Sequence, residues 1–296
     1  MSDIMNCMPF GQLMDWVLQE KKGSDTVFGV HRPYVADAKN NMTIFGRALE
    51  TPVGPAAGPH TQLAQNIIAS YYAGARFFEL KTVQKMDGAE LSACVNKPCI
   101  LADDEGYNCE WSTELTVPDA MGEYIKAWFI LHVIAGEFGL GAQDGFQFNL
   151  SVGYDLEGIK GDKINTFIDG MMEAKDTAVF KECRQWLLDH ADRFQKFTRE
   201  DIEAIPSNVC NSATISTLHG CPPQEIESIA NYLLTEKHLN TFVKCNPTLL
   251  GYDFARKTMD EMGYDYMVFG DFHFRDDLQY EDAVPMLTRL MKLSEE

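Results

Sequence analysis

Short apolar runs that alternate with longer segments of helical periodicity are the feature that most constrains the fold of this chain. From Thr51 onward each run ends in a loop, and a segment with helical spacing follows it. The predicted strands are residues 51–57, 76–83, 146–151, 213–218, 241–245 and 266–269. Because strands that alternate with helices are joined by crossovers, this order predicts an α/β fold with a parallel sheet.

The segments between the predicted strands carry their apolar residues on one face, as helices that cover a sheet do. Pro222 and Pro223 suit the first turn of one such helix. The apolar positions are Leu63, Ile67, Ile68 and Tyr71; Met121, Tyr124, Trp128 and Leu131; Ile226, Ile229, Ala230, Leu233 and Leu234; and Val284, Leu287, Leu290 and Met291.

Three regions are predicted along the chain. Residues 1–50, which contain an amphipathic piece around Trp16, form an N-terminal extension that packs on the main domain. Residues 51–296 form that domain, and residues 86–118 are a polar insertion loop within it. About six βα units do not close an eight-stranded barrel. We therefore expect either an incomplete TIM-type (β/α)8 barrel, in a chain that lacks its C-terminal units, or an open doubly wound sheet.

Charge and cysteine usage exclude several classes of protein. The 25 Lys and Arg residues face 44 Asp and Glu residues, a formal net charge of -19, so a nucleic-acid partner is not expected. The eight cysteines form no CxxC pair, and no basic-then-apolar leader is present. This pattern favours a cytoplasmic protein with reduced thiols. No apolar run is long enough for a membrane helix, and no metal site is predicted.

Small and positively charged residues gather where the predicted strands end. The turn at residues 54–61 has two glycines and no bulky side chain before His60, so a flat ligand or a phosphate could approach its backbone; an ordinary tight turn is the alternative. Lys81 and Lys244 each interrupt an apolar strand. A buried ammonium needs a partner, so each lysine is expected to face a ligand, a carboxylate such as Glu79, or water. On one barrel rim both would point into the same crevice.

Two further strand ends carry polar groups. Asn149 and Ser151 end the third strand and could bind the edge of a heterocycle, or simply terminate the strand. Cys221 precedes a predicted helix and lies near His219 in the sequence, which could lower the pKa of its thiol. A nucleophile, a general acid and a packed structural cysteine all remain open for Cys221. His273 is either a further polar group at a strand end or a solvated loop residue.

Together these segments resemble the FMN domain shared by dihydroorotate dehydrogenases and dihydropyrimidine dehydrogenase. The segments that carry the resemblance are residues 51–63, 77–84, 106–115, 146–158, 216–225 and 243–251. The likeness to the bacterial flavoprotein subunit of the selenate reductase type spans nearly the whole chain. The resemblance implies a dihydroorotate dehydrogenase-like FMN barrel in residues 51–296. It also implies 4Fe–4S clusters, FAD and NAD(P)H in the full-length protein, whose motifs are absent from this chain.

The resemblance also assigns individual residues. It implies that FMN is held by Ala56, Ala57, Gly58, Lys81, Thr82, Asn149, Lys244 and Asn246. Lys244 would lie near the flavin N1 region, where a cation stabilises the reduced anionic flavin. The family's catalytic cysteine after Asn-Leu-Ser is replaced here by Val152, which cannot transfer a proton. Either Cys221 or His219 is therefore the predicted catalytic proton donor, or the domain only relays electrons.

Three functions follow from these observations. The first is a flavin-dependent oxidoreductase domain of an iron-sulfur flavoprotein, which passes hydride or electrons through FMN between a small-molecule substrate and redox partner subunits or domains. The second is a Schiff-base aldolase in which Lys81 or Lys244 attacks a carbonyl. The third is a non-catalytic docking module of a redox complex, which binds through its acidic surface and residues 86–118.

Overall fold

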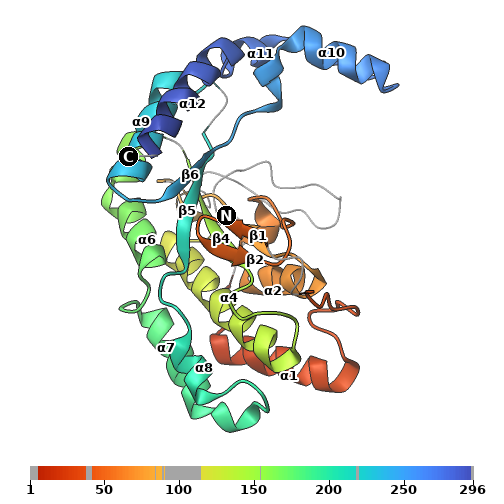
Figure 1. Cartoon of the computed structure of the whole chain (residues 1–296), viewed down its shortest axis with the longest axis vertical. Coiled ribbons are helices and arrows are strands. Elements are labelled where there is room, and N and C mark those ends of the chain that lie inside the picture. Colours follow the sequence, from red (N-terminus) through yellow and green to blue (C-terminus); the bar gives the residue numbers. More distant parts are fainter. Residues whose placement is uncertain are drawn as a thin grey trace. The chain divides into compact units, whose positions relative to one another are not determined.

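The computed structural model describes residues 6–37, 42–83, 85–88, 90, 115–153, 155–217 and 220–294 (Figure 1). The chain divides into two compact units, of which the first comprises Met1–Ser151 and Gly161–Ser212 and the second comprises Val152–Lys160 and Ala213–Glu296. The first unit contains α1 (Phe10–Ser24), β1 (Met42–Ile44), β2 (Arg47–Leu49), the 3-10 helix η2 (Pro59–Thr61), α2 (Ala64–Ala73), β3 (Phe77–Glu79), α4 (Val117–Phe138), α6 (Asp162–Met172), α7 (Ala178–Asp189), the 3-10 helix η3 (Ala191–Arg193) and α8 (Arg199–Ala204). The second contains α5 (Leu156–Lys160), α9 (Pro223–Thr235), β6 (Asn240–Val243), the 3-10 helix η4 (Pro247–Leu250), α10 (Tyr252–Glu261), α11 (Phe272–Asp276) and α12 (Tyr280–Ser294).

The main sheet has the strand order β3-β4-β5-β6, where β4 is Gln147–Val152 and β5 is Cys210–Ile215. The border between the two units falls within β4 and β5. β3 and β4 pair in parallel, with Phe78 opposite Phe148. All six residues of β4 are buried, as expected for a parallel strand that is covered on both faces. The predicted α/β fold with parallel strands is confirmed.

Two of the six strand predictions are wrong. The segment at residues 51–57 runs beside β3, and Val53 O accepts a hydrogen bond from Arg76 N at 2.8 Å. Pro52 and Pro55 have no N–H to donate, so a regular ladder does not form. Residues 266–269 pair with no strand of the described chain, and the Val268 side chain is 98% exposed, because no partner strand covers this apolar run.

The four predicted helices are present as α2, α4, α9 and α12. α4 is the central helix of the first unit and packs against α2, α6 and α7 (Figure 1). Thr116 begins it by accepting a hydrogen bond from Asp119 N, and Gly139 ends it with a φ of 65°. Because most of α4 is buried, its sequence is apolar on nearly every face.

Several elements were not predicted from the sequence. β1 and β2 form a hairpin whose two turn residues, Phe45 and Gly46, both have positive φ. Helices α5 to α8 occupy most of the chain between β4 and β5. Helix α1, in contrast, contains the amphipathic piece predicted around Trp16; it packs against α7, and the Phe10 ring meets the Trp186 ring edge to face at 5.6 Å. These aromatic contacts fasten α1 to the core of the first unit.

Candidate functional site

Lys81 lies two residues beyond the last residue of β3, where the backbone is clamped from two sides. The Lys81 N–H donates to Thr61 O at 3.4 Å, and the Tyr124 hydroxyl donates to Lys81 O at 3.0 Å. The lysine is only 2% exposed. The predicted cofactor-binding lysine is therefore a buried residue whose main chain is fixed by η2 and α4.

Two pairs of buried polar side chains lie beside Lys81 along the sheet. The hydroxyl oxygens of Thr82 and Ser151 are 2.7 Å apart, and Ser212 Oγ donates to Asn149 Oδ1 at 2.7 Å. All four side chains are buried. Because buried polar groups must be hydrogen-bonded, these pairs fix the orientation of the hydroxyl and amide groups at this end of β3 and β4.

The turn that precedes η2 is held against β3 by specific contacts. The Ala57 N–H donates to the Glu79 carboxylate at 3.0 Å, and the Gly58 N–H donates to Thr61 Oγ1 at 3.2 Å. A Cβ added to Gly54 would lie 1.5 Å from Phe77 O, so only glycine fits there. The small-residue turn that contains Ala56, Ala57 and Gly58 thus lies beside Glu79, the last residue of β3, and its role in binding a flat ligand stays a prediction.

Cys221 belongs to the second unit and differs from its prediction. Burial raises the pKa of its thiol, a hydrogen bond with Thr217 lowers the pKa, and the Glu225 carboxylate raises it further. The net shift is upward, and the expected lowering by the helix start is wrong. Helix α9 begins at Pro223 after Pro222, and neither proline has an N–H that could stabilise a thiolate. A raised pKa keeps the thiol protonated, which suits a proton donor better than a nucleophile.

Of the remaining predicted residues, Lys244 and Asn246 are described by the structure and His219 is not. Lys244 is exposed, and its N–H donates to Ile215 O at 3.2 Å. Asn246 precedes η4, and its carbonyl accepts a hydrogen bond from Leu249 N at 3.1 Å. His219 lies outside the described residues. Because Lys81 belongs to the first unit and Lys244 to the second, a common binding site for the two lysines stays a prediction.

Sequence reasoning missed the groups that support these side chains. Ser212 bonds to Asn149 across 63 positions, and Tyr124 bonds to Lys81 across 43 positions. Neither residue stands out in the sequence, since Ser212 lies inside a strand and Tyr124 inside an apolar helix. The only available signal was the apolar spacing that predicts the helix containing Tyr124.

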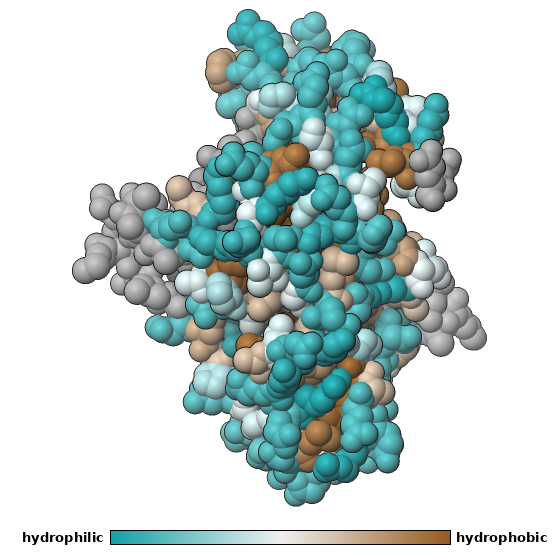
Figure 2. Space-filling model, turned by 90° about the vertical axis from the view of Figure 1, so that its left-hand side faces the viewer, coloured by the Kyte–Doolittle hydropathy of each residue, from teal (hydrophilic) through white to brown (hydrophobic). Residues whose placement is uncertain are grey.

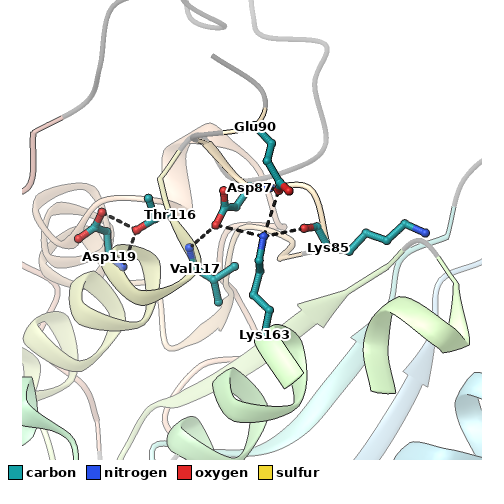
Figure 3. Close-up of polar contacts among 7 residues, drawn as sticks. All are labelled: Lys85, Asp87, Glu90, Thr116, Val117, Asp119 and Lys163. Carbon is teal, nitrogen blue, oxygen red and sulfur yellow. Dashed lines mark hydrogen bonds and ion pairs between the residues drawn. The ribbon is translucent and has the colours of Figure 1, made fainter. Parts of the chain in front are cut away.

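Lys163 of α6 holds the first described residues of the 86–118 segment, and Asp87 links them to Val117 at its other end (Figure 3). Lys163 Nζ donates to Lys85 O and to Glu90 Oε2, each at 3.0 Å, and lies 3.6 Å from Asp87 Oδ2. The same Asp87 oxygen accepts a hydrogen bond from Val117 N at 3.2 Å. These contacts anchor the segment near the start of α4. Its interior, residues 91–114, lies outside the described residues, as does the prediction that it forms an insertion loop.

The parallel strands and the polar groups at their carboxyl ends define an α/β domain of the kind that carries TIM-barrel active sites. The family described as the N-terminal TIM-barrel domain of oxidoreductase YgfK matches residues 28–296, and the chain belongs to this family. The predicted fold class is thereby confirmed, and the family is that of the N-terminal domain of an oxidoreductase.

Two curated relatives match the chain over its full length. They are the proteins described as "Putative oxidoreductase YgfK" from Escherichia coli strain K12 and Escherichia coli O157:H7, and each is 46% identical to the chain over 310 residues. The match covers 100% of this chain and 30% of each relative, so the chain spans less than a third of their length.

Two solved structures of Eimeria tenella dihydroorotate dehydrogenase (DHODH) are also similar. The complex with ferulenol has a TM-score of 0.38 at 13% identity, and the match covers 86% of this chain and 71% of that one. The match to the ligand-free enzyme has a TM-score of 0.33 at 13% identity, and it covers 96% of this chain and 80% of that one. At these TM-scores the likeness adds nothing to the family match. Among the described helices, none combines the length and the apolar character needed to cross a membrane.

Proposed function

We propose that this domain binds FMN at the carboxyl ends of β3 and β4 and transfers hydride or electrons through it. The observation that carries the proposal is the buried Lys81 at the end of β3, next to the Thr82–Ser151 hydroxyl pair. Lysine is almost never fully buried unless its ammonium is paired with another group. Parallel α/β folds bind their ligands at this end of the sheet.

The residues present fit the cofactor. An isoalloxazine ring is flat and has N–H donors and carbonyl acceptors along one edge, and FMN supplies hydride and electron-transfer chemistry when bound. An ammonium, two hydroxyls and an amide, those of Lys81, Thr82, Ser151 and Asn149, supply matching donors and acceptors. The small-residue turn around Ala57 allows a flat group to approach the backbone.

Each of these groups has a separate role in the proposal. Lys81 is buried, so its ammonium would interact strongly with an electron-rich ligand. Thr82 and Ser151 fix each other's orientation and so present hydroxyls in a defined direction. Cys221, whose thiol stays protonated, is the proposed proton donor, and His219 is the alternative. Lys244 and Asn246 complete the proposed set of cofactor-binding residues.

The proposal extends to the longer protein of which this family forms the N-terminal domain. There we propose 4Fe–4S clusters, FAD and NAD(P)H as further redox centres, redox partner subunits or domains, and a cytoplasmic location. The assignment to the selenate reductase type stays a prediction, because nothing in the described residues identifies the small-molecule substrate.

The experiment that tests the proposal measures flavin in the purified chain and in a protein of the length of its relatives. We expect visible absorption bands at the flavin maxima, and mass analysis of the released cofactor should identify FMN. Lys81→Met removes the charge but keeps much of the apolar stem, so it should lower the FMN content several-fold. Lys175→Met, at an exposed position, is the matched control and should leave the content unchanged. Absence of FMN from the longer protein after reconstitution would overturn the proposal.

Borohydride trapping separates this function from the Schiff-base alternative. An aldolase lysine reacts with a carbonyl compound, and borohydride reduction then leaves a stable adduct on that lysine. Peptide mass mapping of the treated chain should find no adduct at Lys81 or Lys244. An adduct at either position, together with no bound flavin, would favour the aldolase.

A further inference from the structure

A cavity of about 240 Å³ lies in the first unit, at the opposite end of β4 from the proposed flavin site. Phe146, which lines it, directly precedes β4, whereas Ser151 is at the carboxyl end of that strand. The lining residues are Gly46, Arg47, Ala48, Trp128, His132, Asp144, Phe146, Pro206 and Asn208. Sites for drug-sized ligands begin at about 300 Å³, so this cavity has the size for a single-ring compound.

Arg47 contributes a guanidinium group to the wall of the cavity. Its guanidinium makes one side-chain hydrogen bond, to Asn208 O at 3.4 Å, and no ion pair with any residue that the structure describes. Burial lowers the pKa of Arg47, and this direction shows how poorly its charge is solvated. A partly buried guanidinium is stabilised most effectively by a carboxylate, which it can bind through two parallel hydrogen bonds.

The rest of the wall is aromatic. The Trp128 and Phe146 ring centroids lie 5.1 Å apart, and His132 lies 4.6 Å from Trp128 and 5.1 Å from Phe146. His132 is 3% exposed, and its Nε2 makes no hydrogen bond within the described chain. Burial lowers the pKa of His132 to about 3, so the imidazole is neutral at physiological pH. A neutral ring beside two aromatic rings adds no charge repulsion and can form one further hydrogen bond.

The wall that carries Arg47 is held in place before any ligand arrives. The Gln147 side-chain amide donates to Ile44 O, Arg47 O and Ala48 O at 3.0–3.3 Å. The Asn211 side-chain amide donates to Phe45 O at 3.1 Å. The β1–β2 hairpin is therefore fixed to the starts of β4 and β5 within the first unit. A preformed wall lowers the entropy cost of binding.

We infer that this cavity binds a small single-ring aromatic carboxylate, whose carboxylate pairs with Arg47 and whose ring packs against Trp128 and Phe146. Asp144 also lines the cavity, so a ring that carries an amino group as a second substituent finds an acceptor there. The site is separate from the proposed flavin site, and it requires no flavin. It provides a second small-molecule site on the amino-terminal side of β4.

The test uses 4-aminobenzoate as the probe and isothermal titration calorimetry on the 296-residue chain. The unchanged chain should bind the probe, and 4-aminobenzamide, which lacks the charge, should bind at least about tenfold more weakly. Arg47→Gln should weaken 4-aminobenzoate about tenfold or more by the same reasoning. Arg199→Gln is the matched control, because Arg199 is exposed and also donates a side-chain hydrogen bond to a backbone carbonyl, that of Leu188.

A second pair of variants keeps the test decisive if Arg47→Gln does not fold. Ala48→Leu should fill part of the cavity and abolish binding, whereas Lys81→Met should leave the affinity for 4-aminobenzoate unchanged. Equal affinities of the Ala48→Leu variant and the unchanged chain would overturn the inference. It would also be overturned if millimolar 4-aminobenzoate did not bind, or if Lys81→Met abolished binding and so placed the probe at the flavin site.

Discussion

The two compact units bury their apolar residues to very different extents. In the first unit most of α4 is buried, and it packs against α2, α6 and α7. In the second unit α10 has no buried residue, and β6 is only partly buried. The surface in Figure 2 is mostly hydrophilic, with hydrophobic patches that are small and separated. Both units bury apolar residues and expose some, but the second unit's buried core lies mainly where α9 packs on α12, and Tyr266 and Val268 stay 73% and 98% exposed.

Ion pairs show the same contrast. In the first unit Arg76 Nε lies 2.6 Å from Glu50 Oε2, both side chains are buried, and Arg76 also donates to the carbonyls of Tyr71 and Ala75. In the second unit Arg289 Nε lies 2.7 Å from Glu227 Oε1, but the arginine side chain is 59% exposed. The two pairs thus have similar N–O distances, but the Arg76–Glu50 pair is shielded from water and the Arg289–Glu227 pair is screened by it.

The largest expected difference follows from breaking these pairs. Arg76→Leu leaves the Glu50 carboxylate buried without its cation, so it should lower the free energy of unfolding by about 4 kcal/mol. Arg289→Leu should leave the free energy of unfolding unchanged within error. Both units contain helices, so urea unfolding followed by far-ultraviolet circular dichroism reports on both of them. Equal effects of the two substitutions would show that the two pairs do not differ as their burial indicates.

Removing one aromatic ring from each unit should give the next largest contrast. Phe148 is buried and meets Phe78 and Trp128 edge to face at 5.5 and 5.4 Å. Phe148→Ala should lower the free energy of unfolding by about 3 kcal/mol, because a cavity remains in a packed core. Phe254→Ala, on the exposed face of α10, should have little effect. Hydrogen exchange resolved by peptide should show faster exchange around β4 in the first variant and no change there in the second.

The smallest contrast concerns the dependence of stability on pH. Burial lowers the pKa of His132 from 6.5 to about 3, so between these values the unfolded chain binds a proton that the folded chain does not. The stability of the folded chain therefore falls as the pH drops through this range, by about 1.4 kcal/mol for each pH unit from this residue alone. His132→Leu should remove that part of the slope between pH 6 and pH 5. His238→Asn, at an exposed position with a positive φ, is the control and should keep the slope.

The sequence by itself determined the class of fold and the helices that cover the sheet. Apolar spacing of the kind seen at Ile226, Ile229 and Leu233 is a local property, and it predicted α2, α4, α9 and α12 correctly. Local pattern also indicated which strand ends carry polar side chains, including Lys81 and Asn149. The local pattern failed where forming a strand required a second strand to pair with. Residues 266–269 have the composition of a strand but have no described partner strand.

Only the tertiary structure decided how the polar residues are paired and which of them are buried. Ser212 reaches Asn149, and Tyr124 holds the backbone of Lys81, although each pair is separated by more than forty positions. The raised pKa of Cys221 likewise depends on burial and on the nearby Glu225 carboxylate, rather than on the presence of a cysteine before a helix. Periodicity records which face of an element is apolar, but desolvation and hydrogen bonding depend on what the other elements place around each group.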